Sequence, residues 1–298
     1  MSTALEANGL GKRYGRTWAL RDCSLRVPAG RIAALVGPNG AGKTTLLHLA
    51  VGLLRPDAGA IRVLGEVPAA NPALLDDIGF VAQDTPLYPD FTANELVKMC
   101  GKLNRRCDVP FARERLGHVG IPLDRPVGTL SGGQRAQVAL TLALAKRPRL
   151  LLLDEPVAGL DPLARREFLQ ALMGSVADEG TTVLLSSHLL GDLERVCDFL
   201  ILLQSARVQV LGAVDDLIAE HRVLVGPRQE NPRLAGVATV VRESHTDKQS
   251  TLLVRTDQPI RDPMWTVHSV VLEDLVLAYL ADPSAAALPG PGRLEVTT

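Results

Sequence analysis

The sequence lacks most of what would mark a secreted or nucleic-acid-binding chain. Its four cysteines, Cys23, Cys100, Cys107 and Cys197, are scattered, with no C-x-x-C pair and no adjacent histidines. We therefore expect free thiols in a reducing compartment, and neither a disulfide framework nor a zinc site. Lysine and arginine number 32 and aspartate and glutamate 33, a formal net charge of −1. Without a basic excess, we expect no nucleic acid as a partner.

Long apolar runs and aromatic residues are scarce as well. No uninterrupted stretch approaches the roughly 18 apolar residues that span a bilayer, so we expect no direct bilayer insertion. The short, polar segment 1–9 lacks the basic start and apolar run of a signal peptide. Aromatic residues make up 3% of the 298 residues, but hydrophobic residues make up 46%. That is enough for a sizeable core, in one large domain or two smaller ones.

What the chain does have is a glycine-rich stretch with a specific ending. Residues 37–45 read G-P-N-G-A-G-K-T-T, a G-x-x-x-x-G-K-T motif. Its glycines let the backbone turn sharply, so that successive N–H groups can bind phosphate oxygens. The apolar run 31–36 suits a buried strand before the motif, and 44–52 suits a helix after it. The N-terminus of that helix adds a positive dipole end to the same anion site.

The Lys-Thr pair at the end of this stretch indicates nucleotide chemistry. Lys43 can place a charge on the β- and γ-phosphates, the Thr44 hydroxyl can coordinate Mg²⁺, and Thr45 can add a phosphate contact. A plain glycine-rich turn would explain the glycines, but not the two residues that follow them.

Two acidic residues follow a run of four leucines. Leu150 to Leu153 suits a central parallel strand that is buried on both faces. Asp154 then lies at the carboxyl edge of the sheet, where it can hold Mg²⁺ through water. Glu155 can polarise an attacking water. His188 follows another apolar strand, expected over 181–187, and so is expected at the same sheet edge.

A second anion site is expected at Leu130-Ser131-Gly132-Gly133-Gln134. Ser131 is a good N-cap for a helix that runs to about Ala145, and the two glycines leave backbone N–H groups uncovered. A capped structural helix would explain the serine but not both glycines. Tyr14 can stack on a base or pack on an edge strand. Gln83 can ligate Mg²⁺ or be a solvated side chain at a strand end.

The rest of the pattern predicts a series of short strands and helices. Strands are expected over 5–10, 17–27, 60–64, 78–83, 199–203, 207–211, 223–225, 237–241 and 251–254. Helices are expected over 93–103, 111–119, 163–176, 215–220 and 270–280.

In this order, Tyr14, the phosphate loop, Gln83, 130–134, 150–155, Asp161 and His188 match the motifs of ATP-binding-cassette (ABC) ATPases. Residues 3–220 thus resemble the nucleotide-binding subunit of an ABC transporter. The resemblance implies an α/β P-loop NTPase fold with a small antiparallel β subdomain. It also implies an inserted helical subdomain at 84–130. A small C-terminal α+β extension at 221–282 and a flexible tail at 283–298 would follow.

The resemblance also implies ATP and Mg²⁺ as cofactors, and a role for each matching residue. Glu155 would be the general base for water, with His188, Lys43 and Gln83 as its catalytic partners. Thr44, Gln83 and Asp154 would serve the metal. Nucleotide contacts would come from Tyr14, Gly37, Pro38, Asn39, Gly40, Ala41, Gly42, Lys43, Thr44 and Thr45. Ser131, Gly132, Gly133, Gln134 and Asp161 would act across a dimer interface, on ATP held by a second subunit.

Two departures from the family pattern lie just after the signature. Ala136-Gln137 and Thr141-Leu142 replace the usual Gln-Arg and Ala-Arg pairs, which affects helix packing and surface charge. Residues 272–278, L-E-D-L-V-L-A, resemble the L-E-D-x-F motif of the drug- and polysaccharide-exporting branch, with Val276 in place of Phe. That branch implies export through a separate membrane permease, and a peripheral position on the cytoplasmic face of the membrane. It also implies a second nucleotide-binding subunit, expected to be identical.

Other classes fit the sequence less well. A soluble ABC ATPase acting on ribosomes would carry two cassettes and a charged linker. One acting on DNA would separate Lys43 from Ser131 by a long coiled coil. A nucleotide sensor without turnover would need Glu155 or His188 altered. We expect the permease to contact the surface from Gln83 to Glu95.

Overall fold

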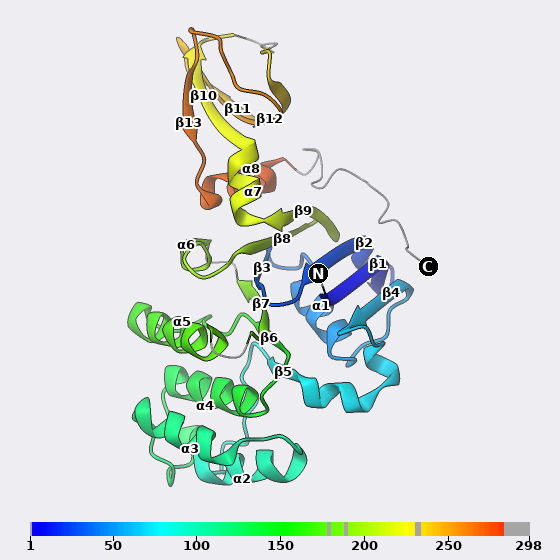
Figure 1. The fold of residues 1–298 in the computed structure, drawn as a ribbon, viewed down its shortest axis with the longest axis vertical. Helices are drawn as coiled ribbons and strands as arrows, with labels where there is room; N and C mark the ends of the chain where they lie inside the picture. The colour runs from blue at the N-terminus through cyan, green and yellow to red at the C-terminus, as the bar shows by residue number, and fades with distance from the viewer. Residues whose placement is uncertain (1, 178–179, 188–189, 230–233, 283–298) are drawn as a thin grey trace.

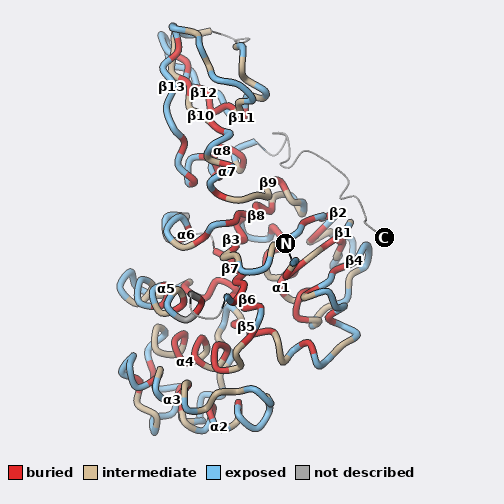
Figure 2. The backbone as a smooth tube through the Cα atoms, in the orientation of Figure 1, coloured by how far each residue is buried: buried red, intermediate tan, exposed pale blue. Residues whose placement is uncertain are grey.

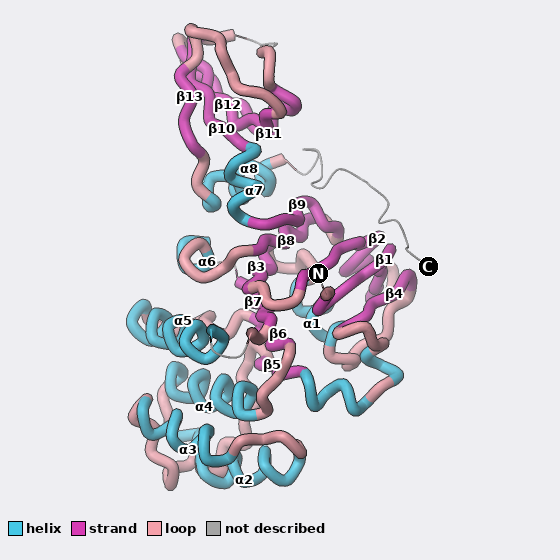
Figure 3. The backbone as a smooth tube through the Cα atoms, viewed as in Figure 1, coloured by secondary structure: helices cyan, strands magenta, loops and turns pink. Residues whose placement is uncertain are grey.

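The computed structural model describes the whole chain except residues 1, 178–179, 188–189, 230–233 and 283–298. A six-stranded sheet lies at the centre of the molecule (Figure 1). Helices α2 (Ala93–Leu103), α3 (Val109–His118) and α4 (Gly132–Ala145) lie at one end, and a four-stranded sheet lies at the other. Figure 3 shows the same division, with helices α2 to α5 (Pro162–Ala177) at one end and strands β10 (His221–Pro227) to β13 (Thr266–Ser269) at the other. None of the described helices is long and apolar enough to cross a bilayer.

The central sheet has the strand order β5-β6-β7-β3-β8-β9. Its strands are β5 (Ile78–Val81), β6 (Leu150–Asp154), β7 (Thr182–Ser187), β3 (Ile32–Val36), β8 (Phe199–Gln204) and β9 (Arg207–Ala213). All neighbouring pairs are parallel except β8 and β9, which are antiparallel. The carboxyl ends of β3 and β6 therefore lie at one edge of the sheet, where the phosphate loop and the acidic pair follow.

Strand β6 is buried on both faces, as its leucine run predicts. Leu151 and Leu153 belong to one buried cluster, with α4 and α5. Leu150 and Leu152 belong to another, with α1 and the antiparallel sheet. The alternation follows from the two-residue period of a strand. Figure 2 shows the buried residues concentrated along the central strands.

A three-stranded antiparallel sheet with the order β2-β1-β4 covers one side of the central sheet. Its strands are β1 (Thr3–Tyr14), β2 (Thr17–Pro28) and β4 (Ala58–Val63). Helix α1 (Lys43–Ala50) contacts β2, β4 and β6. Strand β1 extends beyond the predicted end at Leu10, because Lys12, Arg13 and Tyr14 continue to pair with β2. Two short 3-10 helices, Pro68–Ala70 and Pro72–Asp77, lead to β5.

The other side of the sheet carries the helical layer. Its helices are α2 (Ala93–Leu103), α3 (Val109–His118), α4 (Gly132–Ala145) and α5 (Pro162–Ala177), with a 3-10 turn at Val127–Thr129. Helix α2 has the predicted bounds, and a capping box of Thr92 and Glu95 fixes its start. The predicted start of α3 at Phe111 is wrong. Asp108 caps a helix that begins two residues earlier, and Pro110 lies in its first turn, where proline is tolerated.

The C-terminal elements begin without a connecting loop. Helix α7 (Val214–Glu220) passes directly into β10 (His221–Pro227). The other C-terminal elements are β11 (Val237–His245), β12 (Gln249–Thr256), β13 (Thr266–Ser269) and α8 (Leu272–Ala281). A short helix, α6 (Leu190–Leu193), lies earlier in the chain, between β7 and β8. The four strands form an antiparallel sheet with the order β11-β12-β10-β13. Strand β13 was not predicted, because all four of its side chains are exposed and give no apolar pattern.

This extension shares its core with the central sheet. Leu275, Val276 and Tyr279 of α8 belong to the same buried cluster as Leu200 of β8 and Val210 of β9. Two glutamine amides strengthen the junction: Gln204 Nε2 donates to Leu280 O (2.8 Å), and Gln209 Nε2 to Asp282 O (3.1 Å). The α/β fold with an antiparallel sheet and a helical layer confirms the predicted class. The division of the chain at residue 220 stays a prediction, and the tail 283–298 lies outside the described residues.

Candidate active site

The phosphate loop connects β3 to α1, as predicted. It passes so close to other backbone that side chains are excluded at two positions. A Cβ atom on Gly37 would lie 2.3 Å from Leu203 O, and one on Gly42 would lie 2.4 Å from Ala19 O. Gly42 also has a positive φ of 104°, which favours glycine. The loop therefore needs glycine for its path as well as for its access to a ligand.

Lys43 is held inside this loop by oxygen atoms. Its side chain is largely buried, and Nζ donates to Gly37 O (2.8 Å) and Pro38 O (3.4 Å). Nζ also lies 3.3 Å from Glu155 Oε1, in a buried ion pair. The pair joins two segments that sequence analysis assigned to one site. A buried ammonium group requires oxygen acceptors around it. Phosphate oxygens are anionic acceptors, as the Glu155 carboxylate is, and can take the same place.

The two acidic residues at the end of β6 are held by a serine. Ser186 Oγ donates to Asp154 Oδ1 (2.7 Å), and the Glu155 N–H donates to Ser186 Oγ (2.8 Å). Asp154 is 1% exposed and Ser186 is fully buried. Glu155 adopts a positive φ of 45°, which is unusual for a residue with a side chain. Backbone strain of this kind is often found where a side chain must be aimed at a ligand.

Ser186 is a residue of this site that sequence reasoning missed. It lies opposite Asp154 in the parallel pairing of β6 and β7. The available signal was two serines, Ser186 and Ser187, at the end of an otherwise apolar strand. His188 follows directly, but it lies outside the described residues, so its predicted role is not placed.

The remaining residues on this side are more open. Thr44 and Thr45 are in the first turn of α1, where Thr44 is partly buried and Thr45 is buried. Tyr14 is 54% exposed at the end of β1. Gln83 is exposed in the turn that follows β5, two residues beyond the strand in which it was predicted. Their contacts with nucleotide and metal stay predictions.

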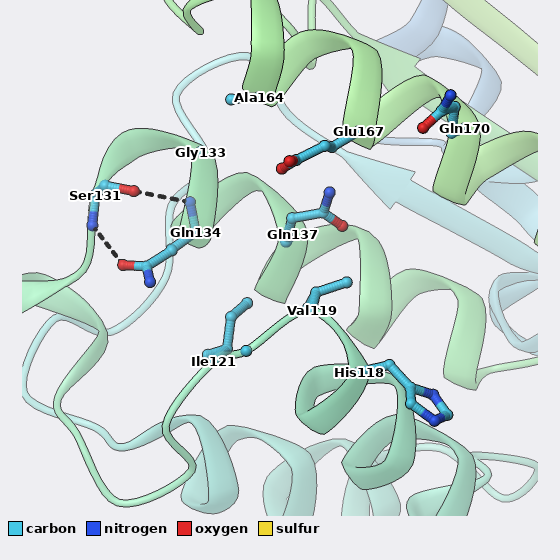
Figure 4. Close-up of a pocket in the computed structure, with 11 residues that line it drawn as sticks. His118, Val119, Ile121, Ser131, Gly133, Gln134, Gln137, Ala164, Glu167 and Gln170 are labelled. Carbon is cyan, nitrogen blue, oxygen red and sulfur yellow. Dashed lines mark hydrogen bonds between the residues drawn. The ribbon is translucent and has the colours of Figure 1, made fainter.

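The signature residues form a separate, capped helix start. Gln134 N–H donates to Ser131 Oγ (3.2 Å), and Ser131 N–H donates to Gln134 Oε1 (3.1 Å) (Figure 4). This reciprocal pair leaves Gly132 and Gly133 at the opening of α4. A pocket of about 620 Å³ lies beside them, and Gln137 and Glu167 line it as well.

Asp161 caps the neighbouring helix. Its Oδ1 accepts from the N–H groups of Leu163 and Ala164, both at 3.0 Å, at the start of α5. Gly133 packs against the same turn, because a Cβ atom there would lie 3.1 Å from the Ala164 Cβ. The signature loop and the Asp161 loop thus lie side by side.

The structure does not join these two loops to the phosphate loop. Helix α1 packs on β2, β4 and β6, whereas α4 packs on α2, α3, α5 and β5. In the part of the chain that the structure describes, no hydrogen bond or ion pair links Ser131–Gln134 to Gly37–Thr45. The phosphate loop and the signature loop therefore lie at two separate helix N-termini, those of α1 and α4.

Comparison with known proteins gives the same picture. A family model described as ABC transporter matches residues 20–158. The chain is 31% identical to the ABC transporter ATP-binding protein YtrB of Bacillus subtilis (strain 168), over 92% of this chain and 97% of that protein. It is 36% identical to the Nod factor export ATP-binding protein I of Ralstonia nicotianae, over 73% of this chain and 69% of that protein.

Solved structures agree with this assignment. An ATP-binding subunit of an ABC transporter matches with a TM-score of 0.64 and 30% identity, over 73% of this chain and 92% of that one. A dimeric bacterial ABC transporter cassette matches with a TM-score of 0.63 and 26% identity, over 70% of this chain and 98% of that one. Fold, motifs and relatives agree, and the chain belongs to the ATP-binding subunits of ABC transporters, a family of ATPases.

Proposed function

We propose that this subunit drives export through a separate membrane permease, by closing on Mg²⁺-ATP with a second subunit of the same kind. The observation that carries the proposal is the separation of the phosphate loop from Ser131–Gln134 within one chain. A second chain in inverted orientation can bring its capped helix start to the ATP held by Lys43. The nucleoside triphosphate then bridges two anion sites, each at a helix N-terminus.

The residues predicted to serve the metal have the chemistry that a magnesium ion requires. Thr44, Gln83 and Asp154 offer hydroxyl, amide and carboxylate oxygens, the donors that Mg²⁺ prefers. The buried Asp154 carboxylate, fixed by Ser186, is a hard-oxygen ligand that can face the ion directly or through water. When bound, the ion neutralises charge on the β- and γ-phosphates.

The residues of the chain supply the rest of the chemistry. Phosphate oxygens replace the acceptors that now surround Lys43, and this frees the Glu155 carboxylate from its ion pair. Glu155 can then accept a proton from the water that attacks the γ-phosphate. Backbone N–H groups of the loop stabilise the charge that develops during transfer.

The permease is proposed to dock on an apolar groove beside the helical layer. The groove has a volume of about 540 Å³, and Phe80, Leu87, Met99 and Leu103 are among the residues that line it. An exposed aromatic pair stands next to it, with the rings of Tyr88 and Phe91 5.3 Å apart. An apolar segment of a permease would bury this surface. Such docking would hold the subunit at the cytoplasmic face of the membrane.

The dimer proposal is tested by light scattering of the Glu155→Gln protein, with and without Mg²⁺-ATP. We expect a monomer without nucleotide and a stable dimer with it, because ATP is bound but not hydrolysed. Adding Lys43→Ala should abolish the dimer. Glu273→Gln makes the same chemical change at an exposed position of α8 and should hydrolyse ATP at the normal rate. A Glu155→Gln protein that binds ATP yet stays monomeric would contradict a homodimer.

The docking proposal is tested by placing a charge on the aromatic pair. Tyr88→Asp or Phe91→Asp should reduce transport at least tenfold in membranes that contain the permease, while nucleotide binding is unchanged. Leu277→Asp is the control, since Leu277 is similarly exposed on α8, away from the groove. Normal transport by both aromatic variants would place the permease elsewhere. It would also favour the alternative, a soluble ABC ATPase acting on the ribosome or DNA.

A further inference from the structure

A pair of thiols lies outside the ATPase machinery, at the junction of α2 and α3. Cys107 Sγ donates a hydrogen bond to Cys100 Sγ at 2.8 Å, which brings the two sulfur atoms into direct contact. Both cysteines are reduced. A disulfide bond has a sulfur–sulfur distance of about 2.05 Å, so closure needs a movement of less than about 1 Å. We propose that Cys100 and Cys107 are a redox-modification site that closes to an intramolecular disulfide by exchange with a low-molecular-weight disulfide.

The backbone around the pair is already in a compact arrangement. Asn104 N–H donates to Cys100 O (2.9 Å), and Cys107 N–H donates to Asn104 O (3.2 Å). Asp108 N–H then donates to Ala145 O (2.7 Å), which ties the segment to the end of α4. A bond between the two sulfur atoms closes a short loop that these hydrogen bonds already hold, so it requires no unfolding of α2 or α3.

The surroundings assign different roles to the two thiols. Cys100 lines the apolar groove, so a small disulfide can reach it from that side. Its sulfur accepts the Cys107 hydrogen bond and lies 3.6 Å from the Asn104 amide nitrogen. Burial, followed by the hydrogen bond with Cys100, raises the pKa of the Cys107 thiol to about 12, so Cys107 keeps its proton at neutral pH. Cys100 is therefore the attacking thiol and Cys107 the resolving one.

The exchange balances without any further reactant. The Cys100 thiolate attacks one sulfur of the small disulfide RSSR, which forms a Cys100–S–S–R bond and releases RS⁻. The released thiolate takes the Cys107 proton. The Cys107 sulfur then attacks the Cys100 sulfur, forms the Cys100–Cys107 bond and expels the second RS⁻. The second RS⁻ takes up the proton that the Cys100 thiol lost when it ionised. Two protein thiols are thereby oxidised, RSSR is reduced to two RSH, and excess thiol reverses the reaction.

The other two cysteines provide internal controls. Cys23 is fully buried in the antiparallel sheet, where its thiol donates to Ala206 O (3.3 Å). Cys197 is buried in the same core cluster as residues of α8, and burial raises the pKa of its thiol to about 12. Among the described residues, no hydrogen bond holds either of them against a second sulfur. We expect both to stay reduced while the protein is folded.

The test uses the full, reduced chain and 2-hydroxyethyl disulfide. Thiol titration after denaturation should fall from four thiols to two, and the intact mass should fall by two hydrogen atoms without an adduct. Peptide mapping should place the bond between Cys100 and Cys107. Cys107→Ser should instead retain an R–S adduct on Cys100, and Cys23→Ser with Cys197→Ser should still form the bond.

Two results would overturn the proposal. One is a folded wild-type protein that keeps four free thiols under conditions in which the unfolded protein reacts. The other is a bond mapped to any other pair of cysteines. Both readouts come from wild-type protein and concern sulfur chemistry alone, so they stand whether or not the ATPase proposals hold. An effect of the disulfide on transport would rest on the proposed docking at the groove.

Discussion

At the scale of single residues, the site depends on a hydroxyl group that contacts no substrate. The Ser186 hydroxyl donates a hydrogen bond to the Asp154 carboxylate and accepts one from the Glu155 N–H, so one side chain orients both acidic residues. Groups of this kind fix the direction in which a metal ligand points, and their loss weakens metal binding even when the ligand remains.

Ser186→Ala should therefore reduce the apparent Mg²⁺ affinity of the ATPase by about 10- to 100-fold. Leaving a buried carboxylate oxygen and N–H without this partner should also cost about 1–3 kcal/mol of stability. The measurement is ATPase rate against Mg²⁺ concentration, with urea unfolding in parallel.

Thr182→Val is the matched control for this substitution. It removes a buried hydroxyl from the same strand, where Thr182 Oγ1 accepts from Gly30 N–H (2.9 Å), away from the acidic residues. We expect it to lower stability and leave the Mg²⁺ dependence unchanged. If both variants have the wild-type Mg²⁺ dependence, Ser186 has a structural role alone.

At the scale of secondary-structure elements, the departures from the family pattern explain a contact between α3 and α4. Arg115 of α3 donates to Thr141 Oγ1 (3.1 Å) and to Gln137 Oε1 (3.2 Å). Gln137 and Thr141 belong to the two residue pairs that differ from the family after the signature. Burial lowers the pKa of Arg115, and the two acceptors offset the cost of burying its charge.

Arg115→Met should lower the free energy of unfolding by about 1–3 kcal/mol, because two buried acceptors lose their donor. Arg113→Met, on the same helix, removes an exposed guanidinium that is bonded to Asn94. This variant should change the free energy of unfolding by less than about 0.5 kcal/mol. Urea unfolding measures both. Combining Arg115→Met with Gln137→Leu should recover part of the loss. Equal effects at positions 113 and 115 would show that burial of this contact has no energetic weight.

The elements that sequence predicted well are those whose signal is local. The leucine run of β6 and the cap residues Thr92 and Ser131 each specify structure within a few positions. The start of α3 was missed because proline in a first turn looks, in sequence, like an interruption.

Contacts between elements were harder to predict, because they depend on packing. The strand order β6-β7-β3 determines which carboxylate meets Lys43. It also places Ser186 opposite Asp154. That order brings together positions far apart in sequence, and no spacing rule in the motif specifies it.

At the scale of the whole molecule, a buried polar pair of the extension lies where it meets helix α7 of the cassette. His221 Nε2 lies 2.9 Å from the Tyr279 hydroxyl, and Nδ1 lies 2.6 Å from Leu217 O. Both side chains are almost fully buried. The arrangement fits a neutral imidazole that donates from Nδ1 and accepts the tyrosine proton at Nε2.

Burial lowers the pKa of His221 below its usual 6.5. The unfolded chain therefore binds a proton on His221 more readily than the folded one does. The stabilisation that neutral His221 contributes is fully present above pH 6.5 and is lost as the pH falls below 6.5. We expect urea unfolding at pH 5.5 to show lower stability than at pH 7.5.

The His221→Gln variant separates this effect from other acid-sensitive groups. It should be less stable at pH 7.5, and its stability should change less between pH 7.5 and 5.5. The carboxylates with lowered pKa values, such as Glu6 and Asp108, lose their contribution only below about pH 4.5, outside this window. An identical pH dependence in the two proteins would contradict the role of His221.

The shared core also has a consequence for how the chain is made. Leu275 and Tyr279 of α8 belong to the same buried cluster as Ala34 and Val36 of β3, so one cluster includes residues near the beginning of the chain and residues near position 280. During synthesis on a ribosome, the apolar face around β8 and β9 stays uncovered until α8 has emerged. Long sequence separation slows folding and prolongs exposure of such a surface. The nascent cassette therefore depends on helix α8 to leave the aggregation-prone stage of its own biosynthesis.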